Sequence, residues 1–351
     1  MNDKITRKMS ETTSKRKKEH IELCLTDKVA FIEKSNGFDK YEFSHYAITE
    51  IEIEKIKLSA KFFNKVIDFP FLISCMTGGT MEAENINALL AVVANNLNIA
   101  LGVGSQRQAL ENDTHHNSYK IIRKNAPKIP ILGNIGAAQI LSAKAEDKIK
   151  YLAELIEADA FVIHVNPLQE LLQKNGEPNF KGFLKSLERI CNKVSLPIIV
   201  KEVGAGINRK AAKKLLEAGV KGIDVAGAGG TSWAGVEILR NKDERGIEFW
   251  DWGIPTADCI SEVKKLKNHF DFMLIGSGGI NNGMDAAKAL ALGSDVVASA
   301  RIILQCLDQS GIAGVEKLIL SWFDTVKKVM YLTNSRSLNQ LRKNGLQEIR
   351  K

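Results

Sequence analysis

The sequence predicts an α/β fold in which eight parallel strands close into a (β/α)8 TIM barrel, with an N-terminal extension and C-terminal helices. The main observation is that short apolar runs, typical of buried strands, alternate eight times with helical patterns. Strands that alternate with helices pair in parallel, and eight of them close a sheet without edges. A doubly wound open sheet is the alternative, but no Gly-x-Gly-x-x-Gly motif opens a first helix.

The predicted strands each end in small or polar residues. They lie at 71–75, 99–103, 130–134, from 161 to a stop at Pro167, and at 197–201, 222–226, 272–275 and 295–298. Helical patterns follow at 83–96, 118–125, 142–157, 180–193 and 209–218, and a further helix opens at Gly283. Two amphipathic helices, at 312–331 and 335–344, finish the chain. The polar stretch 241–252 is predicted to be a mobile loop.

These elements divide the chain into four segments. Residues 1–14 are polar without periodicity, which predicts a disordered tail. Residues 15–70 are expected to form a capping segment and a hairpin, since Arg16 and His20 would share one helix face and the stretch 43–63 alternates charged and β-branched residues. The barrel is predicted over 71–310, and C-terminal helices with a basic tail over 311–351.

The composition indicates a soluble globular protein. Of the 351 residues, 44% are hydrophobic and 26% charged, which is enough for a large core. No apolar run approaches the roughly 18 residues of a membrane span, and the N-terminus lacks the apolar region of a secretion signal. The five cysteines are odd in number and widely spread, which argues against a disulfide framework or zinc site. We therefore expect a cytoplasmic protein with no membrane partner.

The net charge of +8 resides at the two ends of the chain. Residues 1–20 carry seven Lys and Arg against three acidic residues, and residues 336–351 carry five against one. The region between them is neutral, so we expect no nucleic-acid partner on the barrel. Charged tails of this kind are more often solvated than functional.

Glycines after the seventh strand predict a phosphate site. Gly278 and Gly279 belong to a Gly-Ser-Gly-Gly turn, and Ala300 and Arg301 follow the eighth strand. Backbone N–H groups approach phosphate closely at glycine, and barrels commonly bind phosphate in the loops after strands seven and eight. The alternative is that these glycines only make tight turns.

Polar residues also collect at the other strand ends, where barrel chemistry takes place. They are Thr77, Ser105, Asn134, Lys201 and Thr231, with His164, Asn166, Gln169 and Glu170 after the fourth strand. A lone lysine in an apolar strand needs a partner at the barrel mouth, so Lys201 is either a Schiff-base lysine or a donor to an electron-rich heterocycle. Position alone leaves both open.

Seven motifs at these strand ends resemble those of the type 2 isopentenyl-diphosphate delta-isomerases. They are Met76-Thr-Gly-Gly79, Gly104-Ser-Gln-Arg107, His164-Val-Asn-Pro-Leu-Gln-Glu170, Val200-Lys-Glu-Val-Gly204, Gly229-Gly-Thr-Ser232, Trp252-Gly-Ile-Pro-Thr256 and Ala287-Lys-Ala-Leu-Ala-Leu-Gly293. Arg16-Lys17-x-x-His20 matches the family's N-terminal substrate signature, and the resemblance spans about residues 14–340 in unchanged order. It implies an FMN-dependent isomerase that interconverts isopentenyl and dimethylallyl diphosphate with Mg²⁺. NAD(P)H would reduce the flavin without net consumption, and we expect a homo-oligomer, tetrameric or larger.

The resemblance also implies a role for each motif. FMN would contact Met76, Thr77, Gly78, Ser105, Asn134, Lys201, Thr231, Gly279, Ile280, Asn281, Ala300 and Arg301. The substrate would contact Arg16, Lys17, His20, Ser105, Gln106, Arg107, Asn166 and Gln169, with His164 nearby and Glu170 as the Mg²⁺ ligand. The resemblance therefore favours the interpretation in which Lys201 donates to an electron-rich heterocycle rather than forming a Schiff base. It also makes the N-terminal cations Arg16, Lys17 and His20 a segment that closes over the diphosphate.

The catalytic residues implied are Gln169 and His164. The resemblance makes reduced flavin the main acid–base group, with Gln169 positioning or relaying a proton on the opposite side. His164 is the one residue of its strand end that titrates near neutrality. Two plainer readings stay open, in which His164 is a structural histidine and Gln169 only orients the substrate.

The sequence departs from the family at two turns. Asn281-Asn282 stands where an Arg is frequent, which removes one cation near the phosphate, and Thr333-Asn334 replaces a Thr-Gly.

Other flavin or phosphate proteins fit less well. A 2-hydroxy-acid oxidase would need a His-Gly-Gly turn, and an inosinate-dehydrogenase-like enzyme would need a cysteine after strand six. A non-catalytic binding protein would not need the polar cluster after strand four.

Overall fold

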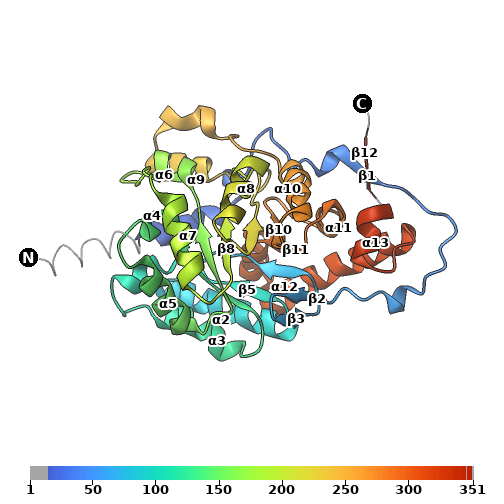
Figure 1. The fold of residues 1–351 in the computed structure, drawn as a ribbon, viewed down its shortest axis with the longest axis horizontal. Coiled ribbons are helices and arrows are strands. Elements are labelled where there is room, and N and C mark those ends of the chain that lie inside the picture. The colour runs from blue at the N-terminus through green and yellow to red at the C-terminus, as the bar shows by residue number, and fades with distance from the viewer. Residues whose placement is uncertain (1–14, 345, 350–351) are drawn as a thin grey trace, which may run out of the picture.

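The computed structural model describes residues 15–344 and 346–349, so the predicted disordered tail at 1–14 lies outside the described residues. Eight parallel strands form a closed barrel in the order β10-β11-β4-β5-β6-β7-β8-β9 (Figure 1). Their bounds are Phe71–Ile73 (β4), Ala100–Gly102 (β5), Ile131–Gly136 (β6), Ala160–His164 (β7), Ile198–Lys201 (β8), Gly222–Asp224 (β9), Met273–Ser277 (β10) and Val296–Ser299 (β11). The predicted TIM barrel is confirmed.

Helices follow the strands and surround the barrel (Figure 1). The longer ones are α2 (Met81–Asn96), α3 (Asn117–Asn125), α5 (Ala145–Ile156), α7 (Phe183–Lys193), α8 (Arg209–Glu217), α9 (Trp233–Asn241), α10 (Thr256–Lys264) and α11 (Gly283–Leu292). Two short helices, α4 (Ala137–Ile140) and α6 (Pro167–Leu172), come directly after strands β6 and β7. They were not predicted, because helices this short show no apolar period.

The C-terminal helices differ in extent from their prediction. Helix α12 runs over Arg301–Leu332, and Gly311 interrupts it with a φ of 61°. The expected start at residue 312 therefore lies just past an internal kink, and the helix begins immediately after β11. Helix α13 spans Leu338–Asn344. No helix within residues 15–344 and 346–349 is long and apolar enough to cross a bilayer.

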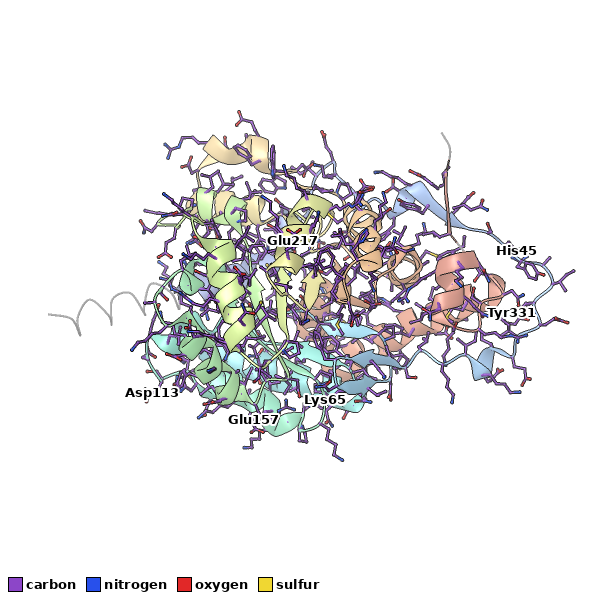
Figure 2. All side chains as sticks on the ribbon, viewed as in Figure 1. His45, Lys65, Asp113, Glu157, Glu217 and Tyr331 are labelled. Atoms are coloured by element: carbon purple, nitrogen blue, oxygen red, sulfur yellow. The ribbon has the colours of Figure 1, made fainter. Side chains whose placement is uncertain are left out.

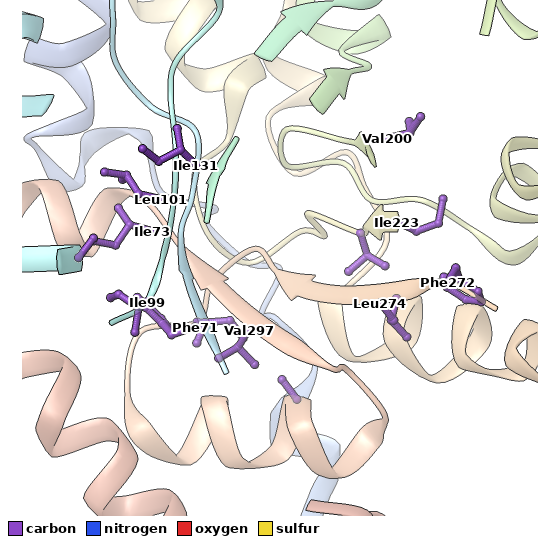
Figure 3. Packing of buried hydrophobic residues seen from close by; sticks show 14 of the residues in the cluster. Phe71, Ile73, Ile99, Leu101, Ile131, Val200, Ile223, Phe272, Leu274 and Val297 are labelled. Carbon is purple, nitrogen blue, oxygen red and sulfur yellow. The ribbon is translucent and has the colours of Figure 1, made fainter. Parts of the chain in front are cut away.

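Two apolar cores hold the barrel together. Side chains such as Ile73, Leu101 and Ile131 are fully or almost fully buried between the strands and the outer helices (Figure 3). Inside the barrel, Leu72 and Ala100 belong to a second cluster of small and aliphatic side chains. Burial of such side chains contributes about 1.5–3 kcal/mol each, so the two cores fix the positions of the strand ends.

A hairpin closes the end of the barrel opposite to the strands' carboxyl ends. It consists of β2 (Ala60–Phe62) and β3 (Lys65–Ile67), which pair antiparallel. Phe62 and Ile67 are buried in the interior cluster with the first residues of the strands. Lys65 forms an ion pair with Asp159, just before β7, and it lies along the lower edge of the molecule in Figure 2. The hairpin within the predicted segment 15–70 is therefore remote from the strands' carboxyl ends.

Two other segments complete the fold. Strand β1 (Tyr41–Phe43) pairs with β12 (Leu346–Glu348), which joins the N-terminal extension to the end of the chain. The stretch 241–252, predicted to be a loop, contains the 3-10 helix η5 (Glu244–Phe249). Trp250 after it is buried against α9, and its indole donates to the carbonyl of Ala30. The stretch is therefore partly regular, because aromatic residues anchor an otherwise polar segment.

Candidate active site

A cavity of about 270 Å³ lies at the carboxyl ends of the barrel strands, and the helical residues 15–24 form part of its wall. Nearly all of the predicted site residues line it. They are Arg16, Lys17, His20, Met76, Thr77, Gly78, Ser105, Arg107, Asn134, His164, Asn166, Gln169, Glu170, Lys201, Thr231, Gly279, Asn281, Ala300 and Arg301. The fold thus brings together residues that are separated by up to 285 positions in the sequence.

Gln106 and Ile280 are the two predicted site residues that do not line this cavity. The Gln106 side chain is fully buried, donates to the carbonyl of Leu152 at 3.0 Å and accepts from the Asn134 N–H at 3.0 Å. It therefore links β6 to helix α5. Ile280 is a core residue, and its carbonyl accepts a hydrogen bond from the Ser299 hydroxyl at 2.9 Å.

One end of the cavity has the features of a phosphate site. Gly279 has a φ of 70°, and a Cβ there would lie 2.4 Å from the carbonyl oxygen of Gly229, so this close turn requires glycine. Helix α12 begins at Arg301, and its first turn lines the cavity. Nη1 of Arg301 is buried and has no hydrogen-bond partner among the residues that the structure describes. A helix N-terminus beside an unpaired guanidinium fits a phosphate group.

Lys201 lies at the end of β8, beside a buried carboxylate on β9. Its Nζ is 3.8 Å from Oδ2 of Asp224 and donates to the carbonyl of Glu202 at 2.7 Å. Burial raises the pKa of Asp224, and Lys201 and the Ser277 hydroxyl oppose that shift. The Ser277 hydroxyl donates to Asp224, whereas Lys201 lines the cavity and has ammonium hydrogens beyond the one that Glu202 accepts, so Lys201 presents a hydrogen-bond donor of the kind that suits the polar edge of a heterocycle.

His164 is uncharged at neutral pH. Burial, reinforced by the positive charge of Lys201, lowers the pKa of His164 to about 4. Its Nδ1 lies 3.0 Å from Oδ1 of Asn134, and an amide oxygen can only accept, so Nδ1 carries the proton. The ring therefore has little capacity to act as an acid near pH 7.

Gln169 is held by hydrogen bonds at both ends of its amide. Helix α6 begins with Pro167, whose fixed φ suits a first helical position. The Gln169 Oε1 accepts from the Asn166 amide at 2.9 Å, and its Nε2 donates to Oε1 of Glu237 at 3.0 Å. Asn166 also donates to Glu170 at 3.1 Å. These bonds fix the amide orientation of a side chain that is 8% exposed.

Glu237 on α9 is the most important site residue that the sequence reasoning missed. It is fully buried, lies 3.1 Å from the His20 ring nitrogen, and binds Arg240 through its second oxygen. Burial opposes ionisation, but hydrogen bonds from His20, Gln169 and Arg240 outweigh it and lower the pKa of Glu237. A lone carboxylate in an apolar helix was the available signal, as it was for Lys201.

The N-terminal helical residues 15–24 bring cations to the cavity. Burial, reinforced by nearby Arg107, lowers the pKa of Arg16 below its usual value. Arg107 pairs with Glu111 at 3.2 Å, and the His20 ring packs edge-on against Trp233 at 5.1 Å. An anion in this part of the cavity would therefore meet two guanidinium groups.

Glu170 is the acidic residue available for a divalent cation. Its carboxylate accepts from Asn166 and, at 2.8 Å, from the backbone N–H of Glu177. Within the described ranges, no three His, Cys, Asp or Glu side chains gather closely enough to hold a metal ion by themselves. A cation here would need oxygen ligands from a bound anion or water.

Comparisons with known proteins identify the family of the chain. The family described as FMN-dependent dehydrogenase matches residues 165–348. Isopentenyl-diphosphate delta-isomerases are similar over nearly their full length. That of Chlorobium limicola is 44% identical (96% of this chain, 97% of the relative), that of Nostoc sp. 42% (98% and 98%), and that of Pseudescherichia vulneris 42% (95% and 97%).

Solved structures share the fold at low identity. Lactate oxidase from Pediococcus acidilactici has a TM-score of 0.68 at 16% identity, covering 99% of this chain and 95% of that one. The flavin-binding domain of baker's yeast flavocytochrome b2 has a TM-score of 0.67 at 19% identity, covering 92% and 79%. The sequence relatives are far closer than these, and the chain belongs to the isopentenyl-diphosphate delta-isomerase family, on the barrel of the FMN-dependent dehydrogenases.

Proposed function

We propose that this protein interconverts isopentenyl diphosphate and dimethylallyl diphosphate by moving one carbon–carbon double bond. The observation that carries the proposal is the buried chain of hydrogen bonds that joins Asn166, Gln169 and Glu237 beside a phosphate site. A flavin- or phosphate-binding protein without catalysis would have no use for this chain. Membership of the isomerase family supports the same reaction.

FMN, the cofactor that the dehydrogenase family match supports, fits the phosphate end of the cavity. The unpaired Arg301 guanidinium and the α12 N-terminus would hold its phosphate, together with Ala300, Thr231 and the turn at 279–281. The residues proposed to contact its ring system are Met76, Thr77, Gly78, Ser105, Asn134 and Lys201. Reduced FMN, formed with NAD(P)H, would supply an electron-rich ring able to exchange a proton with the substrate.

The substrate diphosphate would lie beneath the N-terminal helical residues. Arg16, His20, Ser105 and Arg107 line that part of the cavity and would bind its oxygens. Glu170 would share a Mg²⁺ ion with the diphosphate, because a hard cation takes a few carboxylate ligands plus phosphate and water oxygens.

Gln169 would orient the hydrocarbon end of the substrate and guide the proton. One carbon must gain a proton while another loses one, and the positive charge that develops between them must be kept from water. An amide is a poor acid, so the fixed orientation of Gln169 is what it contributes, and Glu237 sets that orientation. His164, uncharged and bonded to Asn134, would shape the cavity rather than donate a proton.

The proposal includes the compartment and the oligomeric state of the enzyme. Five free cysteines suit a reducing compartment, so we place the protein in the cytoplasm. The family resemblance supports a homo-oligomer, tetrameric or larger, which light scattering of the purified protein tests directly.

The test of the reaction is an anaerobic incubation of purified protein with isopentenyl diphosphate, Mg²⁺, FMN and NADPH, followed by NMR of the product. Dimethylallyl diphosphate should form, and omission of FMN or of reductant should abolish it. Full activity in flavin-free protein, or no product with every component present, would contradict the proposal.

A further inference from the structure

We propose that Asp224 is a positioning residue that acts through Lys201: as the counter-ion of that lysine, it limits how strongly the ammonium stabilises reduced FMN. The inference rests on the proposed function, because it requires FMN in the cavity. It goes beyond that function by assigning a role to a buried carboxylate that is not among the residues lining the cavity.

Asp224 and Lys201 lie at the same level inside the barrel. Ile199 on β8 belongs to the interior cluster, so Lys201, two residues further along that strand, faces the interior as well. On β9, a Cβ at Gly222 would lie 2.9 Å from the Ile199 side chain, and Asp224 comes two residues later. Asp224 and Lys201 are also paired directly in the sheet. Of the two side chains, that of Lys201 reaches the cavity, and that of Asp224 is only 1% exposed.

The contact between the two residues is one of charge rather than a hydrogen bond. The Lys201 Nζ lies 3.8 Å from Oδ2 of Asp224, which is beyond hydrogen-bond distance. This oxygen is buried and has no hydrogen-bond partner among the residues that the structure describes. The ammonium uses one of its three hydrogens on the carbonyl of Glu202. Asp224 therefore compensates the charge of Lys201 without occupying its hydrogen-bond donors.

Neighbouring groups favour the charged form of this carboxylate. The Ser277 hydroxyl donates to Oδ1 of Asp224, and the backbone N–H of Ala226 donates to the same carboxylate. Burial raises the pKa of Asp224, while the charge of Lys201 and these two hydrogen bonds oppose that shift. Buried charges in proteins are normally paired. Lys201 and Asp224 thus form a pair without net charge beside the cavity.

The counter-ion changes what Lys201 can do for a flavin ring. A hydride from NAD(P)H brings two electrons and one proton to FMN, which leaves the ring with one additional negative charge. A lysine with an uncompensated positive charge would stabilise that form and make the ring a weaker base. With Asp224 beside it, Lys201 still donates hydrogen bonds but attracts negative charge less. The reduced ring then keeps the basicity that proton exchange with the substrate requires.

The experiment is the midpoint potential of bound FMN, measured by anaerobic reduction of the FMN-loaded protein beside a dye of known potential. Asp224→Asn keeps the shape of the side chain and removes its charge. It should favour reduced over oxidised FMN by about tenfold, which for a two-electron couple raises the potential by about 30 mV. An unchanged or lower potential in the folded, FMN-loaded variant overturns the inference.

The Lys201→Met background tests whether Asp224 acts through Lys201. In this background, Asp224→Asn should have no further effect on the potential, because a buried carboxyl group without its cation takes up a proton. An equal rise with and without Lys201 would mean that Asp224 acts on the flavin directly. That result also overturns the inference.

Asp159→Asn is the matched control. Asp159 pairs with Lys65 at 2.7 Å, but it precedes β7 and lies at the end of the barrel remote from the cavity. The same change of charge there should leave the potential unchanged.

Ser277→Ala is a second variant that keeps the inference testable if Asp224→Asn does not fold. It removes the hydroxyl that donates to Asp224 and so disfavours the charged carboxylate. The potential should rise by less than in Asp224→Asn. If Ser277→Ala is the variant available, an unchanged potential overturns the inference.

The potential is measured without isopentenyl diphosphate, so its outcome is separate from that of the isomerase assay. Product formation together with an unchanged potential in Asp224→Asn overturns this inference alone. A protein that binds no FMN contradicts the proposed function, and this inference with it.

Discussion

The side-chain nitrogen of Gln169 donates a hydrogen bond to the buried carboxylate of Glu237 at 3.0 Å. This contact joins α6, after strand β7, to α9, after strand β9, across 68 positions of sequence. It directs the amide nitrogen of Gln169 towards α9, and the hydrogen bond from Asn166 fixes the amide oxygen. The orientation of Gln169 in the cavity therefore depends on Asn166 and on Glu237.

Replacement of Gln169 by Asn is expected to abolish most turnover while FMN stays bound. The shorter side chain cannot span the distance between Asn166 and Glu237, so its amide loses the fixed position. Misplacement of a positioning group by about 1 Å can lower a rate by about 10²-fold. Steady-state kinetics and FMN titration measure the two effects separately, and near-normal turnover would contradict the proposed role.

Glu237→Gln should lower turnover by about tenfold or more, because it removes the charge that binds His20 and Arg240 and weakens the bond to Gln169. The change should appear in kcat more than in FMN affinity. Glu244→Gln, an exposed carboxylate on η5, is the matched control and should behave as the parent protein does. Equal kinetics for the two variants would exclude a positioning role for Glu237.

Arg301→Ala is expected to weaken FMN binding by about 10- to 100-fold, since a charge-assisted hydrogen bond to phosphate is lost. Riboflavin, which lacks the phosphate, should bind both proteins alike. Flavin fluorescence titration with the two ligands checks this. A similar loss of affinity for riboflavin would mean that Arg301 acts on the cavity as a whole.

His164 should remain neutral well below the usual histidine range. Its pKa of about 4 lies below the value of an exposed imidazole, so the charged form becomes significant only as the pH falls towards 4. Nitrogen-15 NMR of labelled histidine should show one ring with a neutral pattern at pH 5.5, absent in His164→Asn. A ring that titrates near pH 6.5 and disappears in that variant would contradict the burial argument.

Phe62→Ala should lower the free energy of unfolding by about 3–5 kcal/mol, because it leaves a cavity in the barrel interior. Val66→Ala, on the same hairpin but 60% exposed, should change stability by less than about 0.5 kcal/mol. Denaturant unfolding provides both values. FMN affinity of the folded protein should be unchanged in both, since the hairpin lies at the opposite end of the barrel.

The barrel was predictable because its strands are buried on both faces and therefore appear as unbroken apolar runs. Each predicted strand overlaps an observed one, with ends that coincide or differ by up to three residues. The predicted family is likewise confirmed by relatives at 42–44% identity. Short motifs at strand ends were sufficient for this, because a closed parallel barrel collects those ends at one opening.

The contacts between distant side chains were not predictable from sequence. Glu237 binds His20 across 217 positions, and Lys17 binds Tyr119 across 102. No local pattern marks such pairs, and their geometry depends on how helices pack outside the barrel. Gln106 was assigned to the substrate by its motif, but the backbone directs its side chain away from the cavity, towards Leu152. Only the folded chain distinguishes these directions.

The proposed isomerisation is tested most simply by the ratio of product formed to NADPH oxidised, measured by NMR in anaerobic D₂O with isopentenyl diphosphate and Mg²⁺. A proton-transfer isomerase predicts many molecules of dimethylallyl diphosphate for each NADPH consumed, with deuterium incorporated into the product. One NADPH consumed for each molecule of product, or substrate recovered unchanged, would contradict isomerisation by proton transfer.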